Sequence, residues 1–144
     1  MKFTKIAVVL AGLAGLFLLS GMPDDAQALQ EKGKSRPAAT KYLMRGIVGP
    51  NCSGLGKLLK AGPADEKAWD TVACHAACLN ELSFALMDDG RCPSGTWAKA
   101  ATGALREGTV ALLAAAEAKD ADAAKAAFKT VTSSCGACHK AHKK

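Results

Sequence analysis

Apolar residues recur at intervals of three and four along most of the chain after residue 37, a pattern typical of amphipathic helices. The first such segment runs from residue 38 to about 60, and the second from about 65 to 87. A third extends from about 95 to 115, and a fourth from about 120 to the C-terminus. No stretch of any length alternates between apolar and polar residues as a half-buried strand would. The pattern therefore predicts four helices and no sheet.

The helix boundaries carry local signals. Asp65 precedes the second helix and Asp120 the fourth, and either Ser94 or Thr96 suits the start of the third. Ala61-Gly62-Pro63 is expected to end the first helix. The pair Gly49-Pro50 interrupts the first pattern, and because proline lacks a backbone donor we expect a kink there or two short helices.

Each segment places its apolar residues on one face. The predicted core-facing positions are Leu43, Met44, Ile47, Val48, Leu55, Leu58 and Leu59 in the first helix, Trp69, Val72, Ala76, Leu79, Ser83 and Leu86 in the second, Trp97, Ala101, Ala104, Leu105, Gly108, Leu112 and Ala115 in the third, and Ala124, Phe128, Val131, Cys135, Cys138 and His142 in the fourth. Four such helices joined by short loops predict an all-α protein, an antiparallel four-helix bundle.

The N-terminus is expected to be removed. Lys2 and Lys5 precede an apolar run over residues 6–19 that is too short to span a bilayer. The small residues of Ala26-Gln27-Ala28 suit a cleavage site. We therefore expect a cleaved signal peptide over residues 1–28, a flexible lead-in over 29–37 and a helical domain over 38–144. The mature protein would be exported to the periplasm, with no stable membrane anchor.

The net charge of +6 is spread as single lysines over helical segments. No basic arm of the kind that binds nucleic acid is present in the sequence, so we expect no nucleic-acid partner. An acidic protein partner is compatible with this charge, although a solvated helical surface is the simpler interpretation.

The fourth helix ends in the motif Cys135-Gly136-Ala137-Cys138-His139. C-x-x-C-H is the attachment signature of a c-type haem, in which both thiols bind the porphyrin and the histidine binds the iron axially. A thioredoxin-like dithiol would need a βαβ context, which the pattern does not predict. A zinc site that added His142 would take all its ligands from one helix, which cannot easily surround a tetrahedral ion. We therefore expect one covalent haem c on Cys135 and Cys138, with His139 as the axial iron ligand.

With these residues in place, the chain resembles the cytochrome c-prime family of class II c-type cytochromes. The resemblance is clearest from Thr96 onward, in Trp97, the alanine-rich run, Ala126-Ala127-Phe128 and the terminal motif, with Met44-Arg45 similar to a step on the family's first helix. It implies a four-helix bundle, a covalent haem with His139 as proximal ligand, and often a homodimer. It also implies that the distal coordination position of the haem iron is either open or occupied by a methionine. The residues that we expect around the haem on this basis are Met44, Phe128 and Lys143. The family usually has an aromatic residue and then arginine after the motif, where this chain has His142 and Lys143.

Two candidate functions differ in whether Met44 binds the iron. As a sixth iron ligand its thioether would favour electron transfer between the haem and a redox partner protein. As an ordinary core methionine it would leave a five-coordinate iron that can bind nitric oxide or carbon monoxide. We do not expect an enzyme, because a peroxidase needs a distal acid–base residue and only Arg45 lies near Met44.

Four further cysteines remain, and they allow three pairings. In an oxidising compartment we expect them to form disulfides. If the first two helices fold back near residue 62, Cys52 lies opposite about residue 73, which favours Cys52–Cys74 and leaves Cys78–Cys92. His75 is expected to be an exposed side chain with no metal.

Overall fold

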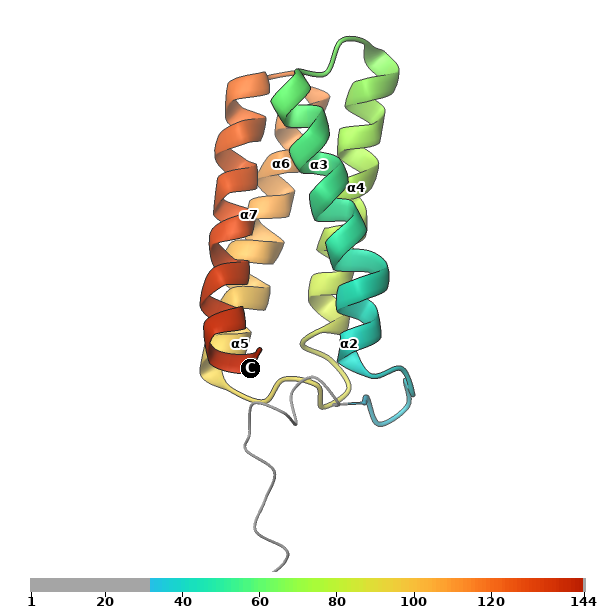
Figure 1. The fold of residues 1–144 in the computed structure, drawn as a ribbon, viewed down its shortest axis with the longest axis vertical. Coiled ribbons are helices and arrows are strands. Elements are labelled where there is room, and N and C mark those ends of the chain that lie inside the picture. Colours follow the sequence, from blue (N-terminus) through green and yellow to red (C-terminus); the bar gives the residue numbers. More distant parts are fainter. Residues whose placement is uncertain (1–31, 144) are drawn as a thin grey trace, which may run out of the picture.

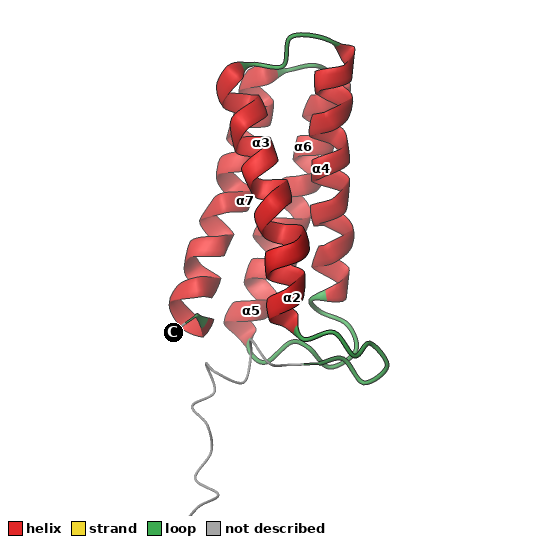
Figure 2. Ribbon diagram, turned by 45° about the vertical axis from the view of Figure 1, so that its right-hand side comes forward, coloured by secondary structure: helices red, strands yellow, loops and turns green. Residues whose placement is uncertain are grey.

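The computed structural model describes residues 32–143, and in this range the chain forms four long helical runs and no strand (Figures 1 and 2). The predicted signal peptide and the first three residues of the lead-in lie outside the described residues. The elements in chain order are α2 (Thr40–Leu43), η1 (Met44–Val48), α3 (Gly49–Ala61), α4 (Glu66–Ala85), α5 (Gly95–Lys99), η2 (Ala100–Glu107), α6 (Gly108–Glu117) and α7 (Ala121–His142), where η1 and η2 are π-helical.

The four runs pack around one core. Helix α3 contacts α4 and α7, and α6 contacts both α4 and α7. All six core positions predicted in the second helix are buried, and the core is completed by residues such as Leu55, Leu112 and Val131, each fully buried. In the described range no helix is long and apolar enough to cross a membrane. The helical fold predicted from periodicity is thus confirmed.

The helix ends are set by the residues that the sequence singled out. The Asp65 carboxylate accepts a hydrogen bond from Ala68 N, and the Asp120 carboxylate accepts from Asp122 N and Ala123 N. Ser94, rather than Thr96, caps α5 by accepting from Trp97 N. Gly62 ends α3 with φ of +80°, a left-handed conformation that glycine adopts without the steric cost of a Cβ.

Of the two expectations at Gly49-Pro50, two short separate helices are not formed, because the run from 40 to 61 stays helical throughout. The π segment η1 lies immediately before the proline, and Gly49 N donates to Met44 O, five residues back. A proline in a regular α-helix clashes with a carbonyl of the preceding turn and lacks a donor for it. The wider π turn accommodates both features without a break.

A polar contact ties the chain before α2 to the loop between α4 and α5. The Asp89 carboxylate accepts from the backbone N–H groups of Ser35 and Arg36, each at 2.9 Å. From the same loop, the almost fully buried Arg91 guanidinium donates to Arg36 O and Ala38 O at 2.9 and 2.7 Å. These bonds hold residues 35–38, which include part of the predicted flexible lead-in, against the end of the bundle where α2 and α5 begin and α7 ends (Figure 1).

Candidate functional site

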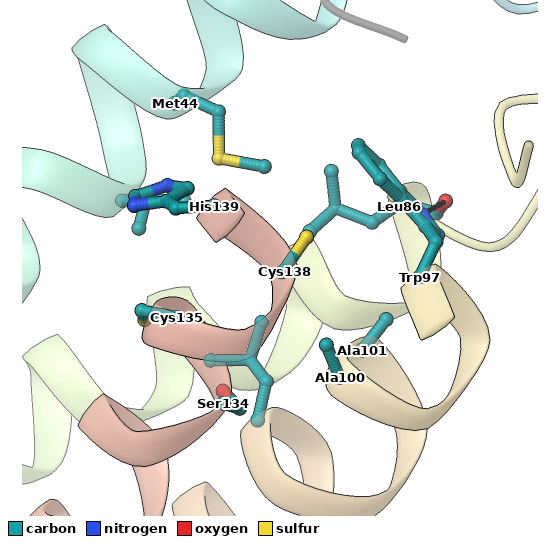
Figure 3. Close-up of a pocket in the computed structure, with 11 residues that line it drawn as sticks. Met44, Leu86, Trp97, Ala100, Ala101, Ser134, Cys135, Cys138 and His139 are labelled. Atoms are coloured by element: carbon teal, nitrogen blue, oxygen red, sulfur yellow. Dashed lines mark hydrogen bonds between the residues drawn. The ribbon is translucent and has the colours of Figure 1, made fainter. Parts of the chain in front are cut away.

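An apolar pocket opens at this end of the bundle, between helices that are far apart in sequence. Its cavity volume is about 40 Å³, and the empty space in and around it, which includes open solvent, is about 430 Å³. Its lining comes from η1, the end of α4, α5, η2 and α7 (Figure 3). The lining residues are Met44, Val48, Leu86, Trp97, Ala100, Ala101, Leu105, Ser134, Cys135, Cys138 and His139.

The structure brings together the three residues of the attachment motif and the proposed distal methionine. Cys135, Cys138 and His139 follow one another on the last turns of α7, and Met44 faces the same space from η1 (Figure 3). Both cysteines are half-buried, whereas His139 is exposed. Two thiols, an imidazole and a thioether in an apolar setting are a donor set that fits a covalently bound haem.

The two cysteines of the motif differ in their surroundings. The thiol of Cys52, on α3, is hydrogen-bonded to Cys135, and this bond outweighs burial and lowers the pKa of Cys135 to about 6. The pKa of Cys52 is raised by the same hydrogen bond and then by burial. The pKa of Cys138 is raised, first by burial and then by the nearby Cys135. Cys135 is therefore the more readily ionised thiol of the pair, and thiolates are the nucleophilic form of cysteine.

The imidazole of His139 is held toward its neutral form. Although the side chain is largely exposed, its pKa is lowered, first by its partial burial beside the pocket and then by the positive charge of Lys143. A neutral imidazole has a free ring nitrogen, and this is the form that binds a metal ion. The electrostatics of the site therefore suit the axial role predicted for His139.

A cluster of side chains joins the C-terminus of α7 to the start of α5. The Trp97 indole donates from Nε1 to Leu86 O at 2.8 Å, and its ring meets the His142 ring edge-on with centroids 5.6 Å apart. His142 Nε2 lies 3.0 Å from Ser94 Oγ, the hydroxyl that caps α5. His142 is buried, and its Nδ1 has no hydrogen-bond partner in the described part of the chain. These contacts fix the wall of the pocket that Trp97 provides.

Sequence reasoning placed His142 on the inner face of the fourth helix but assigned it no structural role. Its contacts with Ser94 and Trp97 depend on a loop that brings residue 94 to the end of α7. In the sequence, these contacts of His142 are signalled only by the apolar stripe of the fourth helix, which continues to residue 142.

Two residues expected near the haem lie outside the pocket. Phe128 is seven residues before Cys135, about two helical turns away, and lines a separate open groove with Lys60, Lys125 and Lys129. Lys143 follows the last residue of α7, is exposed, and reaches the site only through its charge. Met44 is the member of this predicted set that lines the pocket.

The six cysteines are free thiols, so neither of the predicted disulfides is formed. Cys52 contacts Cys135 on α7 rather than Cys74 on α4. Cys74 and Cys78 are exposed on α4, and Cys92 donates to Ser94 O. In the described residues no group of three or more histidine, cysteine, aspartate or glutamate side chains is placed so that it could hold a metal ion.

Of the comparisons with known proteins, one gives a match, and it covers the C-terminal part of the chain. No curated protein and no solved structure matches the chain. A family model does match the C-terminal part, which contains α5, η2, α6, α7 and thus most of the pocket lining. Residues 95–143, which carry Trp97 and the attachment motif, match the family model described as Cytochrome C', and this confirms the resemblance to the cytochrome c-prime family seen in the sequence.

Proposed function

We propose that this protein is an exported mono-haem c-type cytochrome that carries single electrons. In this proposal the haem is attached to Cys135 and Cys138, and His139 is its axial iron ligand. The observation that carries the proposal is the convergence of these residues with Met44 in one apolar pocket. The family match over residues 95–143 supports it.

The proposal includes an antiparallel order of the four helices, with the haem between them near the C-terminus. Loops of a few residues separate α3 from α4 and α6 from α7, and consecutive runs pack against each other. Helices joined in this way lie side by side with opposite directions. Periplasmic export, a redox partner protein and a homodimer belong to the proposal as well, on the basis of the sequence.

When bound, the haem would supply an iron that cycles between ferric and ferrous states and so carries one electron. The chain's own residues would attach it, orient it and exclude water from it. Leu86, Trp97 and Leu105 are buried and present apolar surface to the pocket. The low polarity of this lining disfavours the more highly charged ferric site and would raise the reduction potential.

Met44 decides between this function and the binding of a diatomic gas. Among the lining residues outside the attachment motif, the Met44 thioether and the Ser134 hydroxyl are the side-chain groups that could bind iron. Ser134 Oγ already donates to Val131 O at 2.7 Å, within its own helix. If Met44 does not bind the iron, the open position faces apolar side chains, which suit a neutral molecule such as nitric oxide or carbon monoxide.

The pocket offers no support for a peroxidase. Arg45, the polar residue considered for that role, is exposed and does not line the pocket. The titratable lining groups are the two attachment cysteines and His139, all on α7. No acid–base residue in the described lining therefore faces His139 from another helix.

Optical spectra of the haem-loaded protein test the proposal, recorded oxidised and reduced, with and without carbon monoxide. Electron transfer with Met44 ligation predicts a low-spin spectrum that carbon monoxide leaves unchanged, and Met44→Leu converts it to high spin with the haem retained. Met87→Leu is the matched control, because Met87 is half-buried but does not line the pocket. A high-spin wild-type spectrum that shifts with carbon monoxide would favour gas binding instead. If no haem is attached under reducing conditions, both functions are wrong.

A further inference from the structure

A thiol from another helix contacts the attachment motif. Cys52 lies on α3 and Cys135 on α7, and the two thiols are hydrogen-bonded although they are 83 positions apart in the sequence, at 52 and 135. Both side chains are half-buried, and the helices that carry them pack against each other. The contact is therefore part of the α3–α7 interface.

The other cysteines do not share this arrangement. Cys74 and Cys78 are exposed on α4, and Cys92 donates to a carbonyl of its own loop. Cys138 lines the pocket and is half-buried. Cys52 is thus the cysteine outside the motif that contacts an attachment thiol.

We propose that Cys52 and Cys135 form a reversible disulfide between α3 and α7 in the protein that has not yet received haem. This inference rests on the proposed function, since it gives Cys135 a second reaction that competes with haem attachment. A sulfur held in a disulfide has no thiol to add to a porphyrin vinyl group. The pair therefore makes attachment depend on the redox state of the surroundings.

The chemistry is a thiol–disulfide exchange with a small disulfide such as oxidised glutathione. The Cys135 thiolate attacks one sulfur of the oxidant, forms a mixed disulfide and releases one glutathione thiolate, which takes up a proton. Cys52 then loses its proton to solvent and attacks the Cys135 sulfur, and the second glutathione leaves as a thiolate that is protonated. Two protein thiols are oxidised by two electrons, and one glutathione disulfide is reduced to two glutathione thiols.

Geometry and reactivity favour these roles for the two residues. The thiol that is more readily ionised acts as the first nucleophile, and a neighbouring thiol resolves the mixed disulfide. Cys135 is the more readily ionised thiol, and Cys52 is already in hydrogen-bond contact with it. After haem attachment Cys135 would be a thioether, and Cys52 would remain as a free thiol beside it.

Peptide mapping tests the disulfide directly, because trypsin separates the cysteines concerned. Cleavage after lysine and arginine places Cys52 in the peptide 46–57 and the two motif cysteines in 130–140, apart from 68–91 and 92–99. The full chain, produced in a host that does not attach c-type haem, is equilibrated with oxidised glutathione, alkylated and digested without reduction. We expect 46–57 linked to 130–140. The link should persist in Cys138→Ser and be lost in Cys135→Ser.

A second measurement follows haem attachment itself. Oxidised protein is mixed with ferrous haem, and covalent haem is measured before and after pre-reduction with dithiothreitol. We expect no haem thioether at Cys135 in the oxidised wild type, thioethers at both motif cysteines after reduction, and a thioether at Cys135 of Cys52→Ser without the reductant. Cys74→Ser is the matched control, and it should behave as the wild type because Cys74 is exposed on α4.

The outcomes separate this inference from the proposed function. A link between Cys135 and Cys138, or between Cys52 and another cysteine, would overturn the inference, as would a Cys52→Ser variant that still needs the reductant. Haem attachment with none of these peptides linked would leave the cytochrome proposal intact and refute the disulfide. The reverse result, a Cys52–Cys135 link in a protein that never attaches haem even after reduction, would refute the function and keep the pair as a redox site.

Discussion

A Gly108→Ala substitution tests how closely α6 packs on α7 beside the pocket. Gly108 is buried at the start of α6. A Cβ built on it would lie 2.9 Å from Val131 Cγ2 and 3.3 Å from Val131 N. Val131 is fully buried and precedes Cys135 by one helical turn. The substitution therefore introduces a steric conflict with the backbone that carries the attachment motif.

Gly103→Ala provides the matched comparison, because it lies in the same helical run and a Cβ there meets no atom within 4 Å. Replacing a helical glycine with alanine stabilises a protein by about 0.5–1 kcal/mol, because the unfolded chain loses freedom. The same gain applies at Gly108, but overpacking a filled site costs about 1–3 kcal/mol. Gly103→Ala should therefore be more stable than Gly108→Ala by about 1–3 kcal/mol, the steric cost alone.

The assay is urea unfolding of both variants, followed by circular dichroism, with the slope of free energy against urea checked for constancy. For a domain of this size 1 kcal/mol corresponds to a shift in Tm of about 4–8 °C, so a thermal melt gives an independent value. If the two variants were equally stable, α6 would not approach α7 at Gly108 as closely as the structure shows.

Further substitutions test the wall of the pocket and the thiol pair. Trp97→Phe removes an indole donor and leaves a buried carbonyl unpaired, which should cost about 1–3 kcal/mol in urea unfolding. Ser94→Ala removes both the cap of α5 and the partner of His142, and should lower the free energy of unfolding by about 1–2 kcal/mol. Ser94→Thr should recover most of that loss, and no recovery would mean that the hydroxyl is not responsible. In the protein without haem, alkylation of Cys135 should rise with pH to half its maximum near the pKa of about 6. Cys52→Ala should move that midpoint upward, because the thiolate loses its donor, and an unchanged midpoint would show that Cys52 does not stabilise it.

The sequence predicted those features that depend on residues close together along the chain. The caps at Asp65 and Asp120 need only the helix that each one precedes, and both are present. The stripe in the fourth helix placed Cys135 and Cys138 on the inner face, and Cys138 and its neighbours line the pocket. The motif needs one helix to hold three donors at fixed spacing, and α7 does so. The motif and the helical periodicity together were sufficient for this part of the site.

The partner of Cys52 could not be predicted in the same way. The expected pairing with Cys74 assumed a regular hairpin of two α-helices. The π segment η1 lies before Cys52, and one additional residue in a turn rotates the remainder of the run by about 100° relative to a regular helix. On α3, Cys52 then lies beside Cys135 of α7. A proline signals that a helix is perturbed but does not specify that a π turn will absorb the perturbation.

The contacts that α6 and α5 make with different parts of α7 explain why the candidate haem site lies at one end of the bundle. Near the middle of α7, Gly108 allows α6 to lie directly against Val131. Near its end, the ring of Trp97 stands edge-on to His142 and occupies the space between α5 and α7. Between these two contacts the third run presents Ala100, Ala101 and Leu105 of η2 to the pocket. These two contacts therefore flank the pocket along α7.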